Sequence, residues 1–145
     1  MVVDRLALAD LVHGYAQRLD RRDPDGVAEL FTQDATFVAY TTPGAAEPTT
    51  RRRGRADIAE AMRTVRHYRA TAHTIGNHVA SVDRDRGTGE TRCVAYHLLG
   101  DDGAETLLVW YLRYLDRYVR TPVGWRIEER ELRVDIVTSQ PLQAG

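Results

Sequence analysis

The sequence contains no lysine, because all 20 of its basic residues are arginine. Schiff-base catalysis and a lysine general base both need a lysine amine, so the sequence excludes these two mechanisms. The single cysteine, Cys93, excludes an intramolecular disulfide and any cysteine-rich metal site. A long apolar run is also missing near the amino terminus, where an acid already appears at Asp4. We therefore predict neither a signal peptide nor a membrane span, and we expect a cytoplasmic protein.

Charge of one sign is equally lacking, since the net charge is −1 although 28% of the residues are charged. Such a balance provides no field that would attract nucleic acid or an anionic membrane. The only dense basic run is RRRGR at 51–55, which could contact phosphate or form a solvated loop before a helix. No aromatic residues accompany this run, so we favour the solvated loop and predict neither a nucleic-acid nor a membrane partner.

Three helices are predicted in the first half of the chain. Residues 4–20 place apolar side chains at i, i+3 and i+4 spacing, which is typical of a helix with one buried face. A second, short helix begins at Pro24 after the capping residue Asp23. Residues 55–68 form the third. The apolar stripes of these helices are Leu8, Leu11, Val12, Tyr15 and Leu19, then Val27, Leu30 and Phe31, then Ile58, Met62 and Val65.

The second half of the chain predicts strands. A first strand at 35–40 precedes the third helix, and the Pro- and Gly-containing segment 41–54 between them is predicted as a loop. Short turns separate four later strands at 71–83, 91–99, 105–120 and 125–137, which indicates antiparallel pairing. The length of 145 residues suits a single domain over 1–145. We therefore predict an α+β fold in which three N-terminal helices pack on a strongly curved, mainly antiparallel sheet that encloses a pocket, the default ligand site.

The stretch TAHTIGNH at 71–78 raises the first functional question. In a regular strand, His73, Ile75 and Asn77 share one face, and His78 belongs to the other. Asn77 then lies about 13 Å further along the pocket than His73. His73 itself is either a core histidine with a satisfied hydrogen bond or a general acid/base in the pocket. Strand alternation alone leaves both interpretations open.

Metal and cofactor sites find no support in the sequence. The five histidines have no ligand spacing, and no His-x-x-x-His pair falls on a helix. A glycine-rich loop that follows a strand and opens a helix is also missing, so no bound nucleotide is indicated. We predict a protein without metal and without cofactor.

The order of elements resembles the nuclear-transport-factor-2-like superfamily, and the local sequence resembles its SnoaL-like branch. Four segments carry the resemblance: YAQRLDRRDPDGVAELFTQDATF (15–37), RGRADIAEAM (53–62), HTIGNHVASVD (73–83) and YLDRYVRTPVGWRIEERELR (114–133). Together they cover nearly the whole chain. The resemblance implies a conical α+β fold. Function is less constrained, because the superfamily includes dehydratases, isomerases, cyclases and plain binding proteins.

Within that group, scytalone dehydratase and the bile-acid dehydratases use a tyrosine and an aspartate of the first helix with a histidine of the strand after the third helix. Tyr15, Asp20 and His73 stand at the matching positions and are our candidate catalytic residues. Tyr15 and Asp20 lie roughly 140° apart on an ideal helix, so we expect the helix to fray or bend near Asp20.

Four further residues are candidates for binding the substrate. The scytalone enzyme draws on a histidine of the following strand, and here His97 and its neighbour Tyr96 both remain candidates for facing the pocket. The candidate substrate-binding residues are Asn77, Tyr96, His97 and Trp110.

Two classes of function follow from these residues. The first is a cofactor-independent dehydratase, isomerase or cyclase for an apolar polyketide-, steroid- or terpenoid-like molecule. In it His73 moves a proton, Asp20 orients the imidazole, and Tyr15 holds a substrate oxygen. The alternative is a non-catalytic ligand-binding or dimerising module of the same fold. A cavity with all three side chains at its wall favours the enzyme, and a cavity filled by its own side chains favours the module.

We also expect a homodimer. The segment 106–118 presents apolar or aromatic residues on both faces of its strand: Leu107, Val109 and Tyr111 on one, and Leu108, Trp110 and Tyr114 on the other. The helices can cover only one face of the sheet. An exposed apolar patch of this size is unusual on a monomer, so the other face is predicted to pack against a second copy.

Overall fold

The chain begins with helix α1 (Val2–Asp20) in the computed structural model, which describes residues 1–143. Its buried side chains are those of the predicted stripe together with Ala16. Helix α2 (Pro24–Ala28) follows after the Asp23 cap, whose Oδ1 accepts a hydrogen bond from the Gly26 N–H at 2.9 Å. This bond satisfies one of the backbone N–H donors that have no partner at the start of a helix, and it fixes the start of α2.

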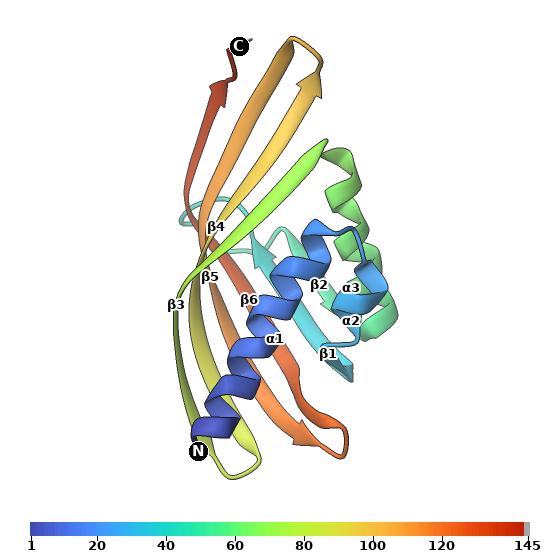
Figure 1. The fold of residues 1–145 in the computed structure, drawn as a ribbon, viewed down its shortest axis with the longest axis vertical. Helices are drawn as coiled ribbons and strands as arrows, with labels where there is room; N and C mark the ends of the chain where they lie inside the picture. The colour runs from blue at the N-terminus through green and yellow to red at the C-terminus, as the bar shows by residue number, and fades with distance from the viewer. Residues whose placement is uncertain (144–145) are drawn as a thin grey trace.

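Six strands form one sheet in the order β2-β1-β6-β5-β4-β3 (Figure 1). Only the β1–β6 pair is parallel; the other pairs are antiparallel. The strands are β1 (Phe31–Tyr40), β2 (Thr50–Arg53), β3 (Ala70–Asp83), β4 (Arg86–Asp101), β5 (Ala104–Thr121) and β6 (Gly124–Pro141). Between β2 and β3 lie helix α3 (Arg55–Met62) and a 3₁₀ turn, η1 (Arg63–His67).

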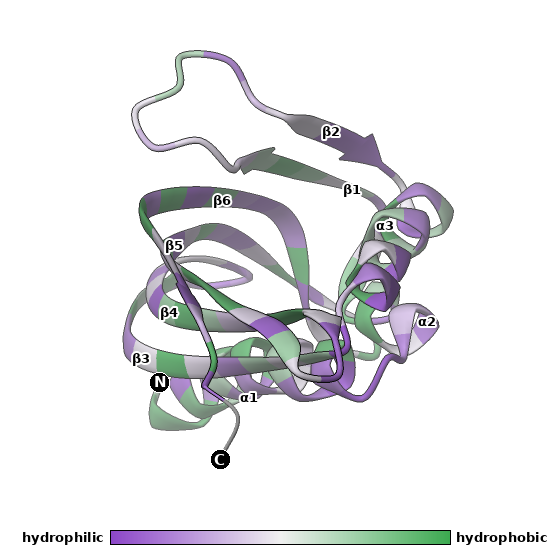
Figure 2. Ribbon diagram, turned by 90° about the horizontal axis from the view of Figure 1, so that it is seen from above, coloured by the Kyte–Doolittle hydropathy of each residue, from purple (hydrophilic) through white to green (hydrophobic). Residues whose placement is uncertain are grey.

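The helices cover one face of this sheet, which we call the inner face, and leave the outer face uncovered (Figure 1). Seen from above, the sheet curls so that β1 and β2 lie across from β3 and β4, and α3 runs along the open side (Figure 2). The hydrophobic core fills the interior, with side chains from α1, α3 and the inner face of the strands. The predicted α+β fold with a curved, mainly antiparallel sheet is confirmed.

Strands β4 and β6 are longer than the predicted strands 91–99 and 125–137, and three further differences from the sequence prediction follow. Phe31 begins β1 and is not part of the second helix; its carbonyl accepts a hydrogen bond from Arg55 Nε at 2.9 Å. Part of the predicted loop 41–54 is the strand β2, which pairs with β1 at the edge of the sheet. Its three consecutive arginines show no alternation of apolar and polar residues, and charged residues are common on edge strands. The third helix ends at Met62, and η1 continues it in a tighter turn.

None of the helices within residues 1–143 is both long and apolar enough to cross a membrane.

Candidate active site

A cavity of about 160 Å³ lies between α1, the α3–η1 segment and the inner face of the sheet. Most of its wall is apolar or aromatic, and two groups in that wall can carry positive charge, His73 from β3 and Arg52 from β2. The other lining residues are Tyr15, Leu19, Phe37, Ala39, Thr41, Thr50, Ala61, Met62, Thr64, Val65, Tyr68, Trp110, Leu112, Tyr114 and Leu132. A cavity with an apolar wall and few polar groups is the usual form of a small-molecule site.

Asp20 at the end of α1 is bound to His73 on β3. The carboxylate Oδ1 lies 2.6 Å from His73 Nδ1, and Oδ2 accepts the backbone N–H of His73 at 2.8 Å. A third hydrogen bond comes from the hydroxyl of Thr71 at 2.9 Å. The imidazole side chain is 6% exposed and the carboxylate 24%. Three donors from one strand therefore fix this acid to β3, and the imidazole is held with it.

The charge of Asp20 determines which ring nitrogen of His73 carries the proton. Burial by itself raises the pKa of Asp20, but the hydrogen bonds from the His73 side chain and backbone and from Thr71 lower it by more. The carboxyl is therefore ionised at neutral pH and can only accept a hydrogen bond. Nδ1 of His73 must be the donor, which leaves Nε2 with a lone pair in the neutral ring. Such an imidazole has the form of a general base.

Tyr15 lies on the same cavity wall but does not contact Asp20. Helix α1 continues regularly through Asp20, so the expected fraying is wrong, and Asp20 reaches β3 from an intact helix end. The Tyr15 hydroxyl donates only a long bond of 3.5 Å to Met62 Sδ. Burial raises the pKa of Tyr15 to about 12, although the nearby Arg130 opposes this. Its hydroxyl is thus a neutral hydrogen-bond donor at physiological pH.

The choice between Tyr96 and His97 is decided by strand parity. His97 is 4% exposed and lies on the inner face, with its ring centroid 6.1 Å from that of His73. Its Nδ1 donates to the Leu108 carbonyl at 3.2 Å, and burial lowers the pKa of this imidazole. The ring packs between Tyr68 and Trp110, at centroid distances of 4.6 and 4.7 Å. Tyr96 is 37% exposed on the outer face. Of the candidate binding residues, Trp110 lines the cavity, whereas neither Tyr96 nor His97 does.

The prediction that Asn77 shares a face with His73 is wrong. A β-bulge places two residues, Gly76 and Asn77, opposite the single residue Arg92 of β4. The bulge reverses the alternation, so Asn77 lies on the outer face and is exposed. His78, which regular alternation assigns to the face opposite His73, instead turns inward and bonds Thr91 at 2.9 Å. Burial lowers the pKa of His78.

A buried ion pair behind Tyr15 escaped the sequence analysis. Asp116 of β5 accepts two hydrogen bonds from Arg130 of β6, at 2.8 and 2.7 Å, and both side chains are fully buried. The Arg130 guanidinium also lies over the rings of Tyr15 and Tyr114, at 4.2 and 4.0 Å. A charged residue at a strand position that alternation assigns to the core can indicate a buried ion pair in the sequence. Here the pairing shift between Ile127 and Glu129 hides it, because regular alternation from Ile127 points Glu129 inward.

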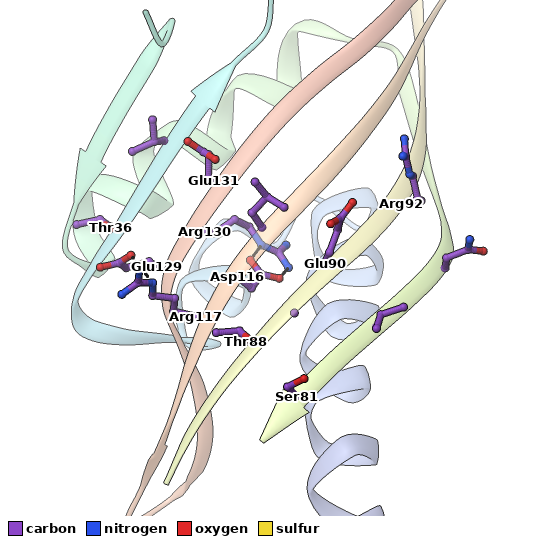
Figure 3. A pocket seen from close by; sticks show the side chains of 15 residues that line it. Thr36, Ser81, Thr88, Glu90, Arg92, Asp116, Arg117, Glu129, Arg130 and Glu131 are labelled. Atoms are coloured by element: carbon purple, nitrogen blue, oxygen red, sulfur yellow. Dashed lines mark hydrogen bonds and ion pairs between the residues drawn. The ribbon is translucent and has the colours of Figure 1, made fainter. Parts of the chain in front are cut away.

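A larger hollow of about 860 Å³ lies on the outer face and contains neither His73 nor Tyr15. Figure 3 shows this outer groove from the side opposite α1, with Glu90, Arg92, Arg117, Glu129 and Glu131 along it. It is an open, charged surface and lacks the paired acid and base of the inner cavity. Across residues 1–143, no group of three or more His, Cys, Asp or Glu side chains is arranged to hold a metal ion.

Several known proteins are similar to this chain in sequence or in fold. The uncharacterized protein Rv2910c of Mycobacterium tuberculosis is 29% identical over 131 residues, which cover 89% of this chain and 84% of that protein. A crystal structure from Novosphingobium aromaticivorans, assigned as a scytalone dehydratase, superposes with a TM-score of 0.81 at 20% identity, over 99% of this chain and 92% of the other. The hexachlorocyclohexane dehydrochlorinase LinA-type3 of Novosphingobium barchaimii superposes with a TM-score of 0.78 at 18% identity, over 97% and 91%. Residues 1–131 match the SnoaL-like domain family, so the chain belongs to this family.

Proposed function

We propose that this protein is a lyase or isomerase that uses His73 as a general acid/base on a small apolar molecule. The observation that carries the proposal is that His73, which lines an apolar cavity, is bound to the carboxylate of Asp20, which does not line it. His73 Nε2 takes a proton from a substrate carbon, and the ionised Asp20 stabilises the imidazolium that forms. Each well-positioned proton transfer of this kind accelerates a reaction roughly 10²- to 10⁴-fold.

Tyr15 and His97 have supporting roles in this proposal. The Tyr15 hydroxyl, whose one hydrogen-bond partner among residues 1–143 is the weak acceptor Met62 Sδ, turns to a substrate oxygen and stabilises the charge that develops there. His97 packs with Tyr68 and Trp110 behind the cavity wall and limits how the neighbouring His73 ring can rotate. The chemistry needs neither a metal nor a cofactor.

The fold neighbours agree with this reaction class. A dehydratase removes water and a dehydrochlorinase removes hydrogen chloride, and each elimination takes a proton from the substrate as well as a leaving group. The alternative of a non-catalytic module is less well supported. Its cavity would be filled by its own side chains, whereas this cavity has about 160 Å³ of space beside a paired acid and base.

Proton exchange tests the proposal without knowledge of the physiological substrate. The protein is incubated in D₂O with small cyclic ketones and halogenated rings, and deuterium uptake at carbon is followed by NMR. We expect uptake above the buffer rate with the wild-type protein, and at least a hundredfold slower uptake with H73A and D20N.

The matched control is H13A, because His13 is an exposed histidine of α1 outside the cavity. Its exchange rate should equal that of the wild type, and all variants should melt cooperatively. Exchange that persists in a folded H73A variant would contradict the proposal.

We also propose that two copies pair through the outer face. Tyr111 of β5 and Ile136 of β6 are cross-strand neighbours there, with 41% and 55% of their surfaces exposed. Val79 of β3, at 72%, adds a third exposed apolar group along the outer groove. The charges of the groove are mixed in sign, so two identical faces can meet without net repulsion.

Light scattering at micromolar concentration is expected to give the mass of a dimer, and I136E is expected to shift it to that of a monomer. The control is V123E, because Val123 is 72% exposed in the turn between β5 and β6. A monomer mass for the wild type, or the same shift in V123E, is the contrary result.

A further inference from the structure

The size of the inner cavity limits what can bind in it. Its volume is about 160 Å³, close to that of an apolar cavity of about 150 Å³ that holds one benzene ring in another protein. A fused multi-ring molecule is larger than the single ring that a cavity of this volume holds. The apolar wall between Leu19, Phe37 and Leu112 suits a single six-membered ring with a small substituent.

Arg52 places one permanent charge in the wall of this cavity. It is paired with Phe37 of β1, an inward-facing residue, so Arg52 faces inward too. Its Nη1 donates to Asp57 Oδ1 at 2.9 Å, while Asp57 Oδ2 accepts the backbone N–H of Arg53 at 3.0 Å. These two bonds lower the pKa of Asp57, the backbone N–H contributing most. The carboxylate therefore stays ionised and holds the guanidinium by one nitrogen.

The other edge of that guanidinium is open. Within residues 1–143, neither Nε nor Nη2 of Arg52 has a hydrogen-bond partner. Elsewhere in this chain the same edge binds carboxylates with both nitrogens, at 2.7–3.1 Å, in Arg113–Asp135, Arg130–Asp116 and Arg133–Glu131. A guanidinium fork of this kind matches the two oxygens of a carboxylate.

We propose that the ligand of this cavity is a single-ring carboxylic acid. The ring lies between the apolar walls, the carboxylate binds Nε and Nη2 of Arg52, and a ring carbon faces His73. Arg52 thus selects a ligand with a carboxylate and sets the orientation of its ring in the cavity. The inference rests on the proposed function for what happens to that carbon, but the binding itself does not depend on catalysis.

The test compares benzoate, its neutral isostere benzamide and the two-ring 2-naphthoate at neutral pH. Binding is followed by the NMR shift of the Trp110 indole N–H, because Trp110 lines the cavity. The Trp125 indole donates to Asp4 at 3.0 Å outside the cavity and serves as the internal control. We expect benzoate to bind about tenfold or more tightly than benzamide, and 2-naphthoate to bind more weakly than benzoate.

R52M is expected to abolish the preference for benzoate, and R52K to reduce it, since a lysine keeps the charge and loses the fork. R53M is the matched control, because Arg53 lies on the same strand and pairs with Thr36, which lines the outer groove. Equal affinity of the wild type for benzoate and benzamide, or an unchanged preference in R52M, overturns the inference. Deuterium exchange that survives such a result leaves the proposed function standing. If benzoate binds with the expected preference but no deuterium exchange is seen, the inference about the ligand stands and the proposed function fails.

Discussion

At the scale of single residues, the candidate site is built on a carboxylate that reaches from a helix end to a strand. An acid at the last turn of a helix is unfavourable because it meets the negative end of the helix dipole. Asp20 offsets this cost with three hydrogen bonds from Thr71 and His73. A residue that is poorly placed for its own helix but well placed for a neighbouring strand is a reasonable candidate for function.

Because Asp20 and His73 are bound to each other, their substitutions should not be additive. We expect D20N and H73A each to slow the proton-exchange reaction by a factor of about 10² or more, and the double variant to be little slower than the slower single one. Exchange rates of the three variants, measured beside their thermal melts, test this. Independent effects, in which the two factors multiply, would show that the residues do not act as a unit.

At the scale of elements, the centre of the sheet is held by a charge pair that no solvent reaches. Asp116 and Arg130 join β5 to β6 beneath Tyr15, and the Tyr118 hydroxyl donates a further bond to Asp116 at 2.9 Å. Burial by itself lowers the pKa of Arg130, but the charge and hydrogen bonds of Asp116, together with Tyr15 and Tyr114, raise it by more, far above its ordinary value. The guanidinium thus remains charged inside the core and depends on this one carboxylate.

Removal of that carboxylate should be costly. D116N leaves the buried Arg130 without a counter-charge, which is expected to lower the free energy of unfolding by about 3–5 kcal/mol. The control is D135N, which breaks the partly exposed pair between Asp135 and Arg113 on the same two strands and is expected to cost about 1 kcal/mol or less. Urea unfolding measures both. Similar losses in the two variants would mean that the buried pair has no special role.

At the scale of the whole molecule, burial of two neutral histidines should make stability depend on pH. Burial lowers the pKa of both His97 and His78 in the folded chain. In the unfolded chain an imidazole takes up its proton near pH 6.5. Between that pH and the lower folded pKa, the unfolded state binds more protons, so acid favours unfolding. The stabilising contribution is complete above about pH 7 and is lost as the pH falls through this window.

Thermal melts between pH 7.5 and pH 5 should therefore show a falling midpoint, with a smaller fall in H97F, where one of the two groups no longer titrates. H67A is the control, because His67 is an exposed histidine of η1, and its melts should follow the wild type. A midpoint that falls as steeply in H97F as in the wild type would contradict this account.

The sequence by itself determined the order of the elements and most of their faces. The stripe of α1 and the long antiparallel strands follow from local periodicity, which depends only on neighbours along the chain. The pairing of Asp20 with His73 was anticipated from a resemblance to the SnoaL-like family, and the residues alone could not establish it. Even with that resemblance, the sequence left open which of Tyr96 and His97 faces inward.

Only the tertiary structure decided which side chains actually line the cavity. The bulge at Gly76–Asn77 and the shift between Ile127 and Glu129 each reverse strand alternation, so Asn77 turns outward and Arg130 turns inward. A bulge depends on how many residues of one strand pair with those of its neighbour, which the pattern of a single strand does not show. The open fork of Arg52 and the volume of the cavity likewise depend on what packs against them. Local patterns contain no information on such contacts.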